Sequence, residues 1–472
     1  MPNGSSARFD RKTVILLACA LACIAVLYAD YAGRGDRENG SRFYAMLGNA
    51  FLAGHTYLKM QPHPALAMLD DPYAPAQNQR YRLHDASLFE GKYYLYFGPV
   101  PALVLFVPVK LLTGYGLSDG DLTFILALTG TFCLSLLICL MAAREESIDR
   151  WGLLFVILSV GVGTWIPFML RRPSFYEAAI AGAYCFSAMG ALFLWVSLHR
   201  RTHRSYWPGL ASLCFGLAVG CRLSHVFNII LPAAAYLFML RYRKLRHGKW
   251  ACAFWIFGPW LACLAALGAY NYARFHSPFV TGWHYQLTIF NVHSSGFHSF
   301  KPWLAPYHAY FYLLKPLPWK DHLVFPFFAP SRFWGTQMTV PWESASHTVG
   351  YQEPVYGLLT NSPFALFYLF YLCDGRSRQS WLPLTRTFTA ALALYSGVMF
   401  LLLVVFNFST ARYAVDFAPW MMALGGIYYL HCLDTASIPQ HYRLLRLMGG
   451  LCAAYGVFTG VMAGYCGYYA CP

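Results

Sequence analysis

The chain has 472 residues, of which 58% are hydrophobic and only 12% are charged, against roughly a quarter charged in a typical soluble domain. Apolar runs near the ~20 residues needed to cross a bilayer recur along the whole chain, which excludes a single soluble core. A net charge of +15 would suggest nucleic-acid binding in a soluble protein. Here much of that charge lies in short loops between apolar runs, so we expect no nucleic-acid partner.

The first apolar run, Thr13 to Ala29, follows Arg8, Arg11 and Lys12. Its end, "YADYAGRG", lacks the small-residue cleavage pattern of a signal peptide. We therefore interpret it as a retained signal-anchor whose N-terminus is cytoplasmic, which makes the following segment external. The strongly basic loops then fall on the cytoplasmic side, namely 199–204, 241–249, 375–378 and 441–446.

The apolar run at 94–113 is the exception among twelve candidate spans. If it crossed the bilayer, the basic loops 199–204 and 241–249 would lie outside, against the positive-inside rule. The run also contains three prolines and a lysine, so we predict a juxtamembrane or re-entrant helix at the outer surface. About eleven transmembrane helices remain in an all-α polytopic protein, at 13–30, 122–142, 152–170, 174–198, 207–221, 225–240, 251–270, 356–373, 385–407, 411–432 and 446–468.

This topology divides the chain into three parts. An N-terminal transmembrane module, 1–270, contains a first external loop at 31–121; a second external loop follows at 271–355, and C-terminal transmembrane helices occupy 356–472. Both loops are rich in Tyr, Trp, Pro and His, unlike flexible linkers. We predict that they fold against the membrane as a cap.

Ionisable residues from distant segments converge on the outer face in this topology. Placing an ionisable side chain at a membrane costs free energy, so each of these residues is a candidate for a functional role. Arginines there suit a phosphate, and a nearby carboxylate can act as a general base or hold a divalent cation. The acids are Asp36, Glu38, Glu177 and Asp416, and the bases are Arg171, Arg172, Arg222, His225 and Arg412.

Structural alternatives exist for several of these groups. Arginines at helix ends also reach lipid headgroups, as Arg171 and Arg172 would, and Glu177 lies where a carboxylate caps a helix. Asp85 has the sequence context of a turn residue. The seven histidines of the second loop show no metal-ligand spacing, so we predict no metal site. Nucleotide-binding loops, nucleophile elbows and zinc-protease motifs are absent from the sequence.

The order of several segments resembles the GT-C superfamily of polytopic glycosyltransferases, and is similar to bacterial aminoarabinose transferases and protein O-mannosyltransferases. "FYAMLGNAFLAGHTYL" resembles their amphipathic surface helix, and "YYLYFGPVPALVLFVPVKLLTG" resembles their proline-containing segment. "LASLCFGLAVGCRLSHVFNIILPA" is similar to a short-armed hairpin with a cation at its turn, here Arg222. "ARYAVDFAPWMMALGG" looks like their late Arg-Tyr and Pro helix. The family places two adjacent acids just before the surface helix, where this chain has Asn39 and Gly40.

The resemblance implies an inverting transferase that moves a sugar from a polyprenyl-phosphate donor to a lipid or glycan acceptor at the outer, periplasmic face of a bacterial inner membrane. Asp36 or Glu38 would be the catalytic base, and Glu177 would line the same cavity. We count as substrate-binding candidates Arg171, Arg172, Arg222, His225, Arg412, Tyr413, Lys92 and Asp85. The sequence identifies no certain cofactor, and a divalent cation is the one that it leaves possible. The alternative is a non-enzymatic transporter or lipid flippase, which would need polar groups near the bilayer midplane and inverted repeats.

Overall fold

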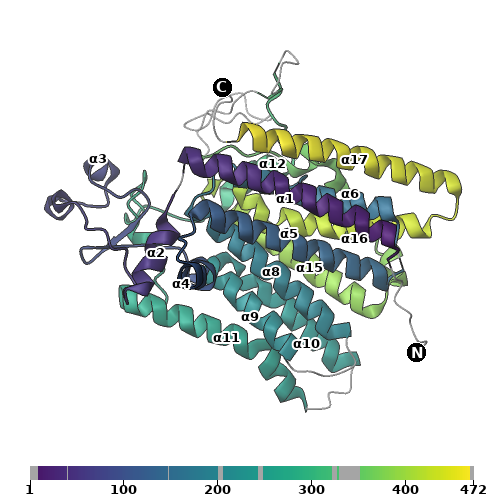
Figure 1. Ribbon diagram of the computed structural model, residues 1–472, viewed down its shortest axis with the longest axis horizontal. Helices are drawn as coiled ribbons and strands as arrows, with labels where there is room; N and C mark the ends of the chain where they lie inside the picture. The colour runs from purple at the N-terminus through teal and green to yellow at the C-terminus, as the bar shows by residue number, and fades with distance from the viewer. Residues whose placement is uncertain are drawn as a thin grey trace.

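The computed structural model describes residues 9–39, 41–146, 148–199, 206–242, 248–320, 327–328 and 351–467. These form a bundle of long, roughly parallel and antiparallel helices that carries a smaller cap of loops and short helices at one end (Figure 1). The principal helices of the bundle are α1 (Arg11–Asn39), α5 (Asp119–Arg144), α6 (Arg150–Gly161), α7 (Ile166–Leu170), α8 (Phe175–His199), α9 (Tyr206–Cys221), α10 (Ile230–Tyr242), α11 (Gly248–Phe275), α14 (Leu366–Cys373), α15 (Pro383–Val404), α16 (Ala418–Thr435) and α17 (Pro439–Cys466).

The all-α polytopic fold predicted from the sequence is confirmed, although the number of spans is not settled at eleven. Each of the eleven predicted segments is largely helical. Within the described ranges, eight helices are long and apolar enough to cross a membrane. The other three predicted spans correspond to α9, α14 and α16, and α9 and α14 are shorter apolar helices.

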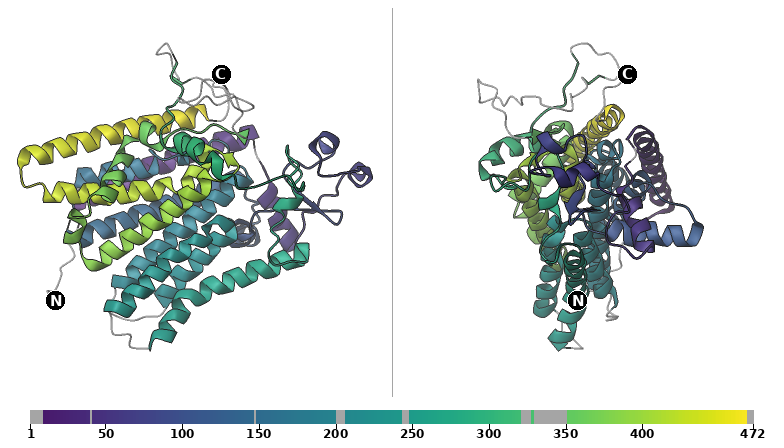
Figure 2. Two further views of the ribbon diagram at one scale, coloured as in Figure 1. Left: turned by 180° about the vertical axis from the view of Figure 1, so that it is seen from behind. Right: turned by 90° about the vertical axis from the view of Figure 1, so that its left-hand side faces the viewer.

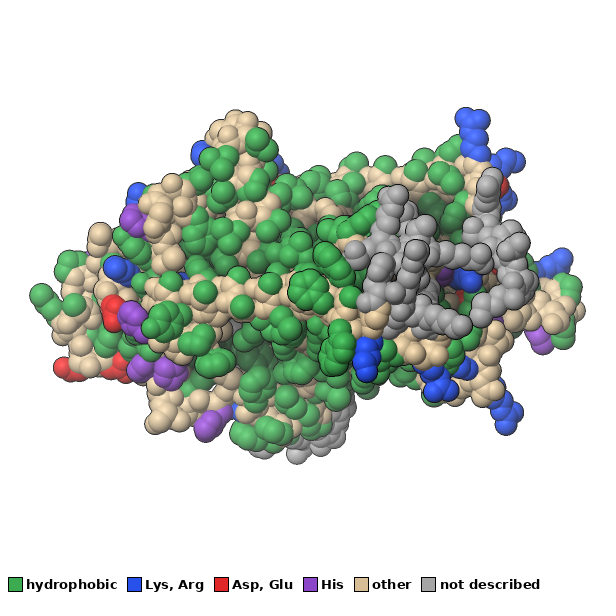
Figure 3. All heavy atoms as spheres, turned by 90° about the horizontal axis from the view of Figure 1, so that it is seen from below, with side chains coloured by type: hydrophobic (Ala, Val, Ile, Leu, Met, Phe, Trp, Pro, Cys, Tyr) green, Lys and Arg blue, Asp and Glu red, His purple; other side chains and the backbone are tan. Residues whose placement is uncertain are grey.

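The two ends of the bundle differ in character. α1 starts at the end opposite the cap and finishes beside the cap, and α17 runs in the same direction (Figures 1 and 2). Between the ends, the face shown in Figure 3 is a broad band of hydrophobic side chains, with Lys and Arg gathered at one end and His at the other. Large apolar side chains point outward from the bundle, as expected for contact with lipid, including Val26, Phe132, Phe254, Leu261, Leu394, Leu401 and Leu451.

Two short helices lie across the direction of the bundle (Figures 1 and 2). They are α2 (Phe43–Leu52) and α4 (Val107–Thr113), and a π-helical turn, η2 (Ala102–Phe106), leads into α4. Asp119, fully buried at the start of α5, accepts hydrogen bonds from the backbone N–H groups of Phe43 and Tyr44 at 3.1 Å each, which fixes α2 on the bundle. A transverse orientation is the one expected of a surface or re-entrant helix at 94–113.

The two loops that we predict to be external bind each other through backbone hydrogen bonds. The first contains α3 (Pro75–Asn78) and an antiparallel hairpin of β1 (Ser87–Phe89) and β2 (Lys92–Tyr94), and the second contains α12 (Ala305–Leu313). The Asp85 N–H donates to the Leu287 carbonyl at 2.8 Å, and the Leu287 N–H donates to the Ala86 carbonyl at 2.9 Å. The described parts of the two loops thus form one cap. Two short parallel strands, β3 (Tyr351–Gln352) and β4 (Phe408–Ser409), and α13 (Leu358–Asn361) complete the fold.

Gly98 allows the first loop to touch the bundle. A Cβ atom at this position would lie 1.9 Å from the Gly220 carbonyl oxygen, and the Gly98 carbonyl accepts a hydrogen bond from the Tyr44 hydroxyl at 3.2 Å. The Gly220 carbonyl belongs to the backbone, which cannot rotate away as a side chain can.

We therefore expect Gly98→Ala to lower the unfolding temperature of the purified protein in detergent, because overpacking typically costs about 1–3 kcal/mol. The matched control is Gly33→Ala in α1, where nothing lies within 4 Å of the added Cβ. Equal unfolding temperatures for the two variants would show that the loop does not approach α9 this closely.

Candidate active site

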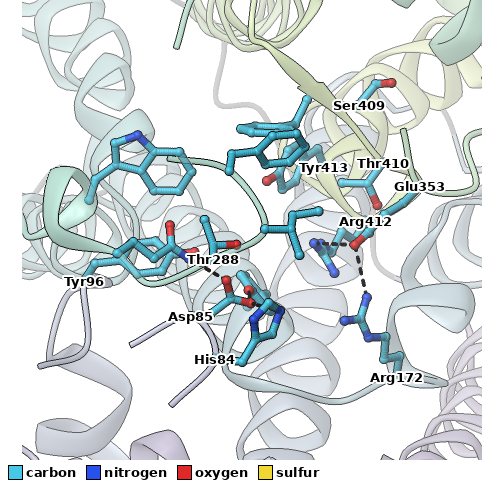
Figure 4. Close-up of a pocket in the computed structure, with 16 residues that line it drawn as sticks. His84, Asp85, Tyr96, Arg172, Thr288, Glu353, Ser409, Thr410, Arg412 and Tyr413 are labelled. Carbon is cyan, nitrogen blue, oxygen red and sulfur yellow. Dashed lines mark hydrogen bonds and ion pairs between the residues drawn. The ribbon is translucent and has the colours of Figure 1, made fainter. Parts of the chain in front are cut away.

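A cavity of about 210 Å³ lies where the cap meets the bundle (Figure 4). Four separate parts of the chain line it: the first loop, the turn that precedes α8 together with its first residues, the second loop, and the segment around β4. Their cavity-lining residues are His84, Asp85 and Tyr96; Arg172 and Tyr176; Trp283, Gln286, Thr288, Ile289, Phe290 and Glu353; and Phe408, Ser409, Thr410, Arg412 and Tyr413.

Two arginines and two glutamates form a buried ionic cluster on one side of the cavity. Arg412 Nη1 lies 2.9 Å from Glu177 Oε1, and Arg412 Nη2 lies 3.1 Å from Glu353 Oε1. The same Glu353 oxygen lies 3.2 Å from Arg172 Nη1. Burial raises the pKa of Glu353, but the guanidinium groups of Arg412 and Arg172 outweigh burial and leave that pKa below its ordinary value. The Glu353 carboxyl is therefore ionised at neutral pH.

Glu177 has the capping role that its sequence context allowed, and it also pairs with Arg412. Its Oε2 accepts hydrogen bonds from the Ser174 N–H at 3.2 Å and the Ser174 hydroxyl at 2.6 Å, which is the arrangement of a helix-capping carboxylate. Its Oε1 pairs with Arg412, which lies in the 3₁₀ helix η8 (Ala411–Asp416). Glu177 itself does not line the cavity.

Asp85 faces the cavity opposite this cluster (Figure 4). It has a left-handed backbone conformation with φ of 64°, which turns the chain into β1. The Gln286 side-chain amide donates to Asp85 Oδ1 at 2.9 Å, and the Tyr176 hydroxyl donates to Oδ2. His84 Nε2 lies 3.3 Å from Oδ2, and burial lowers the pKa of His84 despite the attraction of Asp85, which favours a neutral imidazole.

Tyr176 connects the two sides of the cavity. The Arg412 guanidinium carbon lies 4.6 Å from the centre of the Tyr176 ring, while the hydroxyl of the same ring binds Asp85. A carboxylate and a guanidinium are thus held about one tyrosine side chain apart, facing a cavity lined by aromatic rings. Such a chamber can hold a sugar between an anion-binding site and a base.

A second ionic cluster lies behind Tyr413. Arg222 Nη1 lies 2.9 Å from Asp416 Oδ2, and the Arg222 guanidinium carbon is 4.5 Å from the centre of the Tyr413 ring. His225 Nε2 lies 3.1 Å from Asp416 Oδ1, and its Nδ1 is 2.8 Å from the Tyr395 hydroxyl. Arg222 and His225 do not line the cavity, so their contact with it passes through Tyr413 and the η8 segment.

Asp36, Arg171 and Lys92 also lie outside the cavity lining. The Asp36 carboxylate packs against Gly120 at the start of α5, and an added Cβ on Gly120 would lie 2.7 Å from Asp36 Oδ1. The Arg171 side chain packs near Gly467, and Lys92 is exposed beside the Tyr57 ring. The side chain of Glu38 lies outside the described residues.

The structure therefore gathers four of the predicted site residues around one cavity: Asp85, Arg172, Arg412 and Tyr413. Sequence reasoning missed Glu353, Gln286, Trp283, Tyr96 and Tyr176 as cavity residues. The richness of both loops in aromatic residues was the signal for Tyr96 and Trp283, whereas Tyr176 lies at the start of α8, next to Glu177. For Glu353, the signal was a lone acid near the end of the second loop, in "YQEPVYG".

The described residues do not provide an evident metal site. No three side chains of His, Cys, Asp or Glu in the described ranges come together as a possible set of ligands. The acids of the cavity are engaged by arginine, tyrosine and amide groups. We therefore derive no chemical step through a metal ion.

Comparison with solved structures identifies the fold. The chain is similar to the oligosaccharyltransferase of Archaeoglobus fulgidus in its apo form, with a TM-score of 0.52 and 12% sequence identity over 96% of this chain and 56% of that one. The archaeal oligosaccharyltransferase AglB from the same organism, in complex with an inhibitory peptide and a dolichol-phosphate, gives a TM-score of 0.49 and 11% identity over 97% and 56% of the two chains. The chain thus spans just over half the length of these structures.

No protein-family profile matches the sequence, and no curated protein gives a sequence match. The chain therefore shares its fold with an archaeal oligosaccharyltransferase, which agrees with the fold expected from the resemblance seen in the sequence.

Proposed function

We propose that this protein is a membrane glycosyltransferase that moves a sugar from a polyprenyl-phosphate donor to a lipid or glycan acceptor at the cap end of the bundle. The observation that carries this proposal is the single cavity in which Arg172 and Arg412 face Asp85 across Tyr176. The GT-C fold, shared with a glycosyltransferase, supports it.

The proposed chemistry needs one base and one anion-binding site. Asp85 removes the proton from an acceptor hydroxyl, and the acceptor oxygen attacks the anomeric carbon of the donor. The bond between that carbon and the phosphate oxygen breaks, and the polyprenyl phosphate leaves with the electron pair. Arg172 and Arg412 stabilise the phosphate through charged hydrogen bonds. One displacement inverts the configuration at the anomeric carbon.

Asp36 and Glu38 remain the alternative bases indicated by the family resemblance. We favour Asp85 because its carboxylate faces the cavity, whereas that of Asp36 packs against Gly120. In this scheme Glu177 orients Arg412 and does not contact the acceptor.

The size of the cavity favours a donor with one sugar unit. Its volume of about 210 Å³ is below the ~300–1,000 Å³ of pockets that enclose larger organic ligands. The rings of Tyr96, Tyr176 and Trp283 offer stacking faces for a sugar. We therefore propose a hexose or pentose phosphoryl polyprenol as donor.

Charge asymmetry supports an orientation in the membrane. Basic residues lie at helix ends away from the cap, with Arg144 at the end of α5, Arg150 at the start of α6 and Arg443 near the start of α17, which favours a cytoplasmic position for that end and for the N-terminus. The cap and its cavity would then face the periplasm of a bacterial inner membrane.

A transfer assay tests the proposal directly. The full-length protein in nanodiscs is incubated with radiolabelled hexosyl or pentosyl phosphoryl polyprenols and a lipid extract of bacterial envelopes. We expect label to move from the donor to a product that resists mild acid. A liposome assay for movement of a fluorescent polyprenyl phosphate between leaflets tests the transporter alternative. Movement without any transfer would contradict the enzyme proposal.

The cluster of Arg222, Asp416 and His225 is expected to position η8, and with it Arg412. Replacing Asp416 by Asn leaves the buried Arg222 without an ionised partner at 2.9 Å. We expect kcat/KM to fall about 10- to 100-fold, mainly through a higher KM for the lipid donor, because η8 no longer holds Arg412 in place. The unfolding temperature should fall as well, since breaking a buried pair typically costs about 3–5 kcal/mol of stability.

The double variant Asp416→Asn/Arg222→Gln removes both charges and should recover thermal stability relative to the single variant. The pH profile of the single variant should match that of the wild type, since neither residue contacts substrate. A changed pH profile with an unchanged KM would instead assign Asp416 a chemical role.

A further inference from the structure

Glu353 occupies the space between the two cavity arginines. A single oxygen of its carboxylate, Oε1, lies 3.2 Å from Arg172 Nη1 and 3.1 Å from Arg412 Nη2 (Figure 4). The side chain lines the cavity and is 7% exposed. Arginines bind a phosphate oxygen in the same manner, with guanidinium groups that donate to one anionic oxygen.

The two carboxylates that bind Arg412 differ in how they are held. Glu177 belongs to α8, is fully buried behind the cavity wall, and accepts two hydrogen bonds from Ser174. Glu353 belongs to an extended segment; its N–H donates to the Ser409 carbonyl at 3.1 Å, and its carboxylate is held by the Thr410 side chain and the two arginines, without a helix cap. If Glu353 turned away, Glu177 would still hold Arg412 in place.

The two guanidinium groups beside the cavity already have carboxylate partners in the absence of any ligand. Arg172 and Arg412 are matched by Glu177 and Glu353, and Asp85 adds a further carboxylate. A phosphate anion that entered with Glu353 in place would meet a carboxylate at the arginines and would gain no net attraction. Removing Glu353 from this position leaves two guanidinium groups that face one cavity.

We propose that the Glu353 carboxylate occupies the phosphate subsite and exchanges with the phosphate of the donor, so that Glu353 sets the affinity of the site for anions. This rests on the proposed function for the identity of the donor, although the exchange itself applies to any phosphate. The protein lowers its affinity for phosphate through this competition, which helps the product, a polyprenyl phosphate, to leave after transfer.

The test measures anion binding by the full-length protein in nanodiscs, with inorganic phosphate and farnesyl phosphate as probes and farnesol as the uncharged control. We expect Glu353→Gln to bind both anions about tenfold more tightly than the wild type, with farnesol binding unchanged. Glu353→Asp keeps the charge but shortens the side chain, so it should give a smaller gain in anion affinity. It replaces the Gln variant in the test if that variant folds poorly.

Two further variants separate exchange from a general change in charge. Glu177→Gln removes a carboxylate that does not line the cavity, and Glu90→Gln removes one on the exposed cap, where 63% of the side chain is accessible. Neither should gain the tenfold affinity. Equal gains in all three neutralised variants, or no gain in Glu353→Gln, would overturn the proposal.

The two probes also separate this inference from the proposed function. Tighter binding of inorganic phosphate by Glu353→Gln, without farnesyl phosphate binding by any variant, would support the exchange and count against a polyprenyl-phosphate donor. If neither anion bound to any variant, both proposals would fail.

Discussion

Replacing Asp85 by Asn should reduce the rate of sugar transfer by about 10²- to 10⁴-fold, the usual contribution of a positioned general base. Asn has nearly the same shape as Asp; its carbonyl can accept from Gln286 while its amide donates to the Tyr176 hydroxyl, so both contacts can be kept. We expect little change in the KM for the lipid donor, because the arginines that hold its phosphate are untouched. Single-turnover transfer with a labelled donor measures the effect.

The matched control is the double variant Asp36→Asn/Glu38→Gln, which neutralises the acids at the start of the first external loop. If Asp85 is the base, this variant should keep most of its activity, and its thermal stability should show whether it folds. The opposite pattern, in which the double variant is inactive and Asp85→Asn is active, would identify Asp36 or Glu38, at the end of α1, as the base.

The helical architecture could be predicted because a membrane imposes a simple rule on sequence. Backbone polar groups must be satisfied within each span, so long apolar runs become helices wherever they occur. The run at 94–113 departs from that rule through its prolines and Lys110, and in the structure its helical part lies across the bundle. The number of complete crossings was harder to predict, because α9 and α14 are short.

The candidate site was only partly predictable, because it is assembled from contacts between segments far apart in the chain. Glu353 meets Arg172 across 181 positions, and no local pattern encodes that pairing. Arg222 illustrates the other difficulty. Its place at the turn of an apolar hairpin makes it a candidate, but the direction of its side chain, toward Asp416 and Tyr413, depends on packing.

The acids show why residue type alone does not locate a base. Asp36 follows the first span, as the family resemblance suggests, yet in the structure its carboxylate lies against Gly120. Asp85 looked like an ordinary turn residue, and its φ of 64° is indeed that of a turn. The same turn directs its carboxylate into the cavity, so the turn geometry itself places the functional group.

Replacing Arg412 should have the largest combined effect on stability and activity. Arg412→Gln leaves Glu177 without its arginine, and Glu353 keeps only Arg172 as an arginine partner. Breaking a buried ionic contact in this way typically costs about 3–5 kcal/mol, so we expect a clear fall in the unfolding temperature and loss of transfer. Arg412→Lys keeps the charge but cannot contact both carboxylates through a planar fork, so stability should recover more than activity.

A double variant separates folding from chemistry in this case. Arg412→Gln/Glu177→Gln removes the carboxylate that would be left buried and unpaired, and should regain much of the thermal stability lost in the single variant. It should remain inactive and bind farnesyl phosphate poorly, because Arg172 alone cannot clamp the phosphate. Transfer activity that returns together with stability would show that Arg412 supports the fold only, and the anion site would then have to lie elsewhere in the cavity.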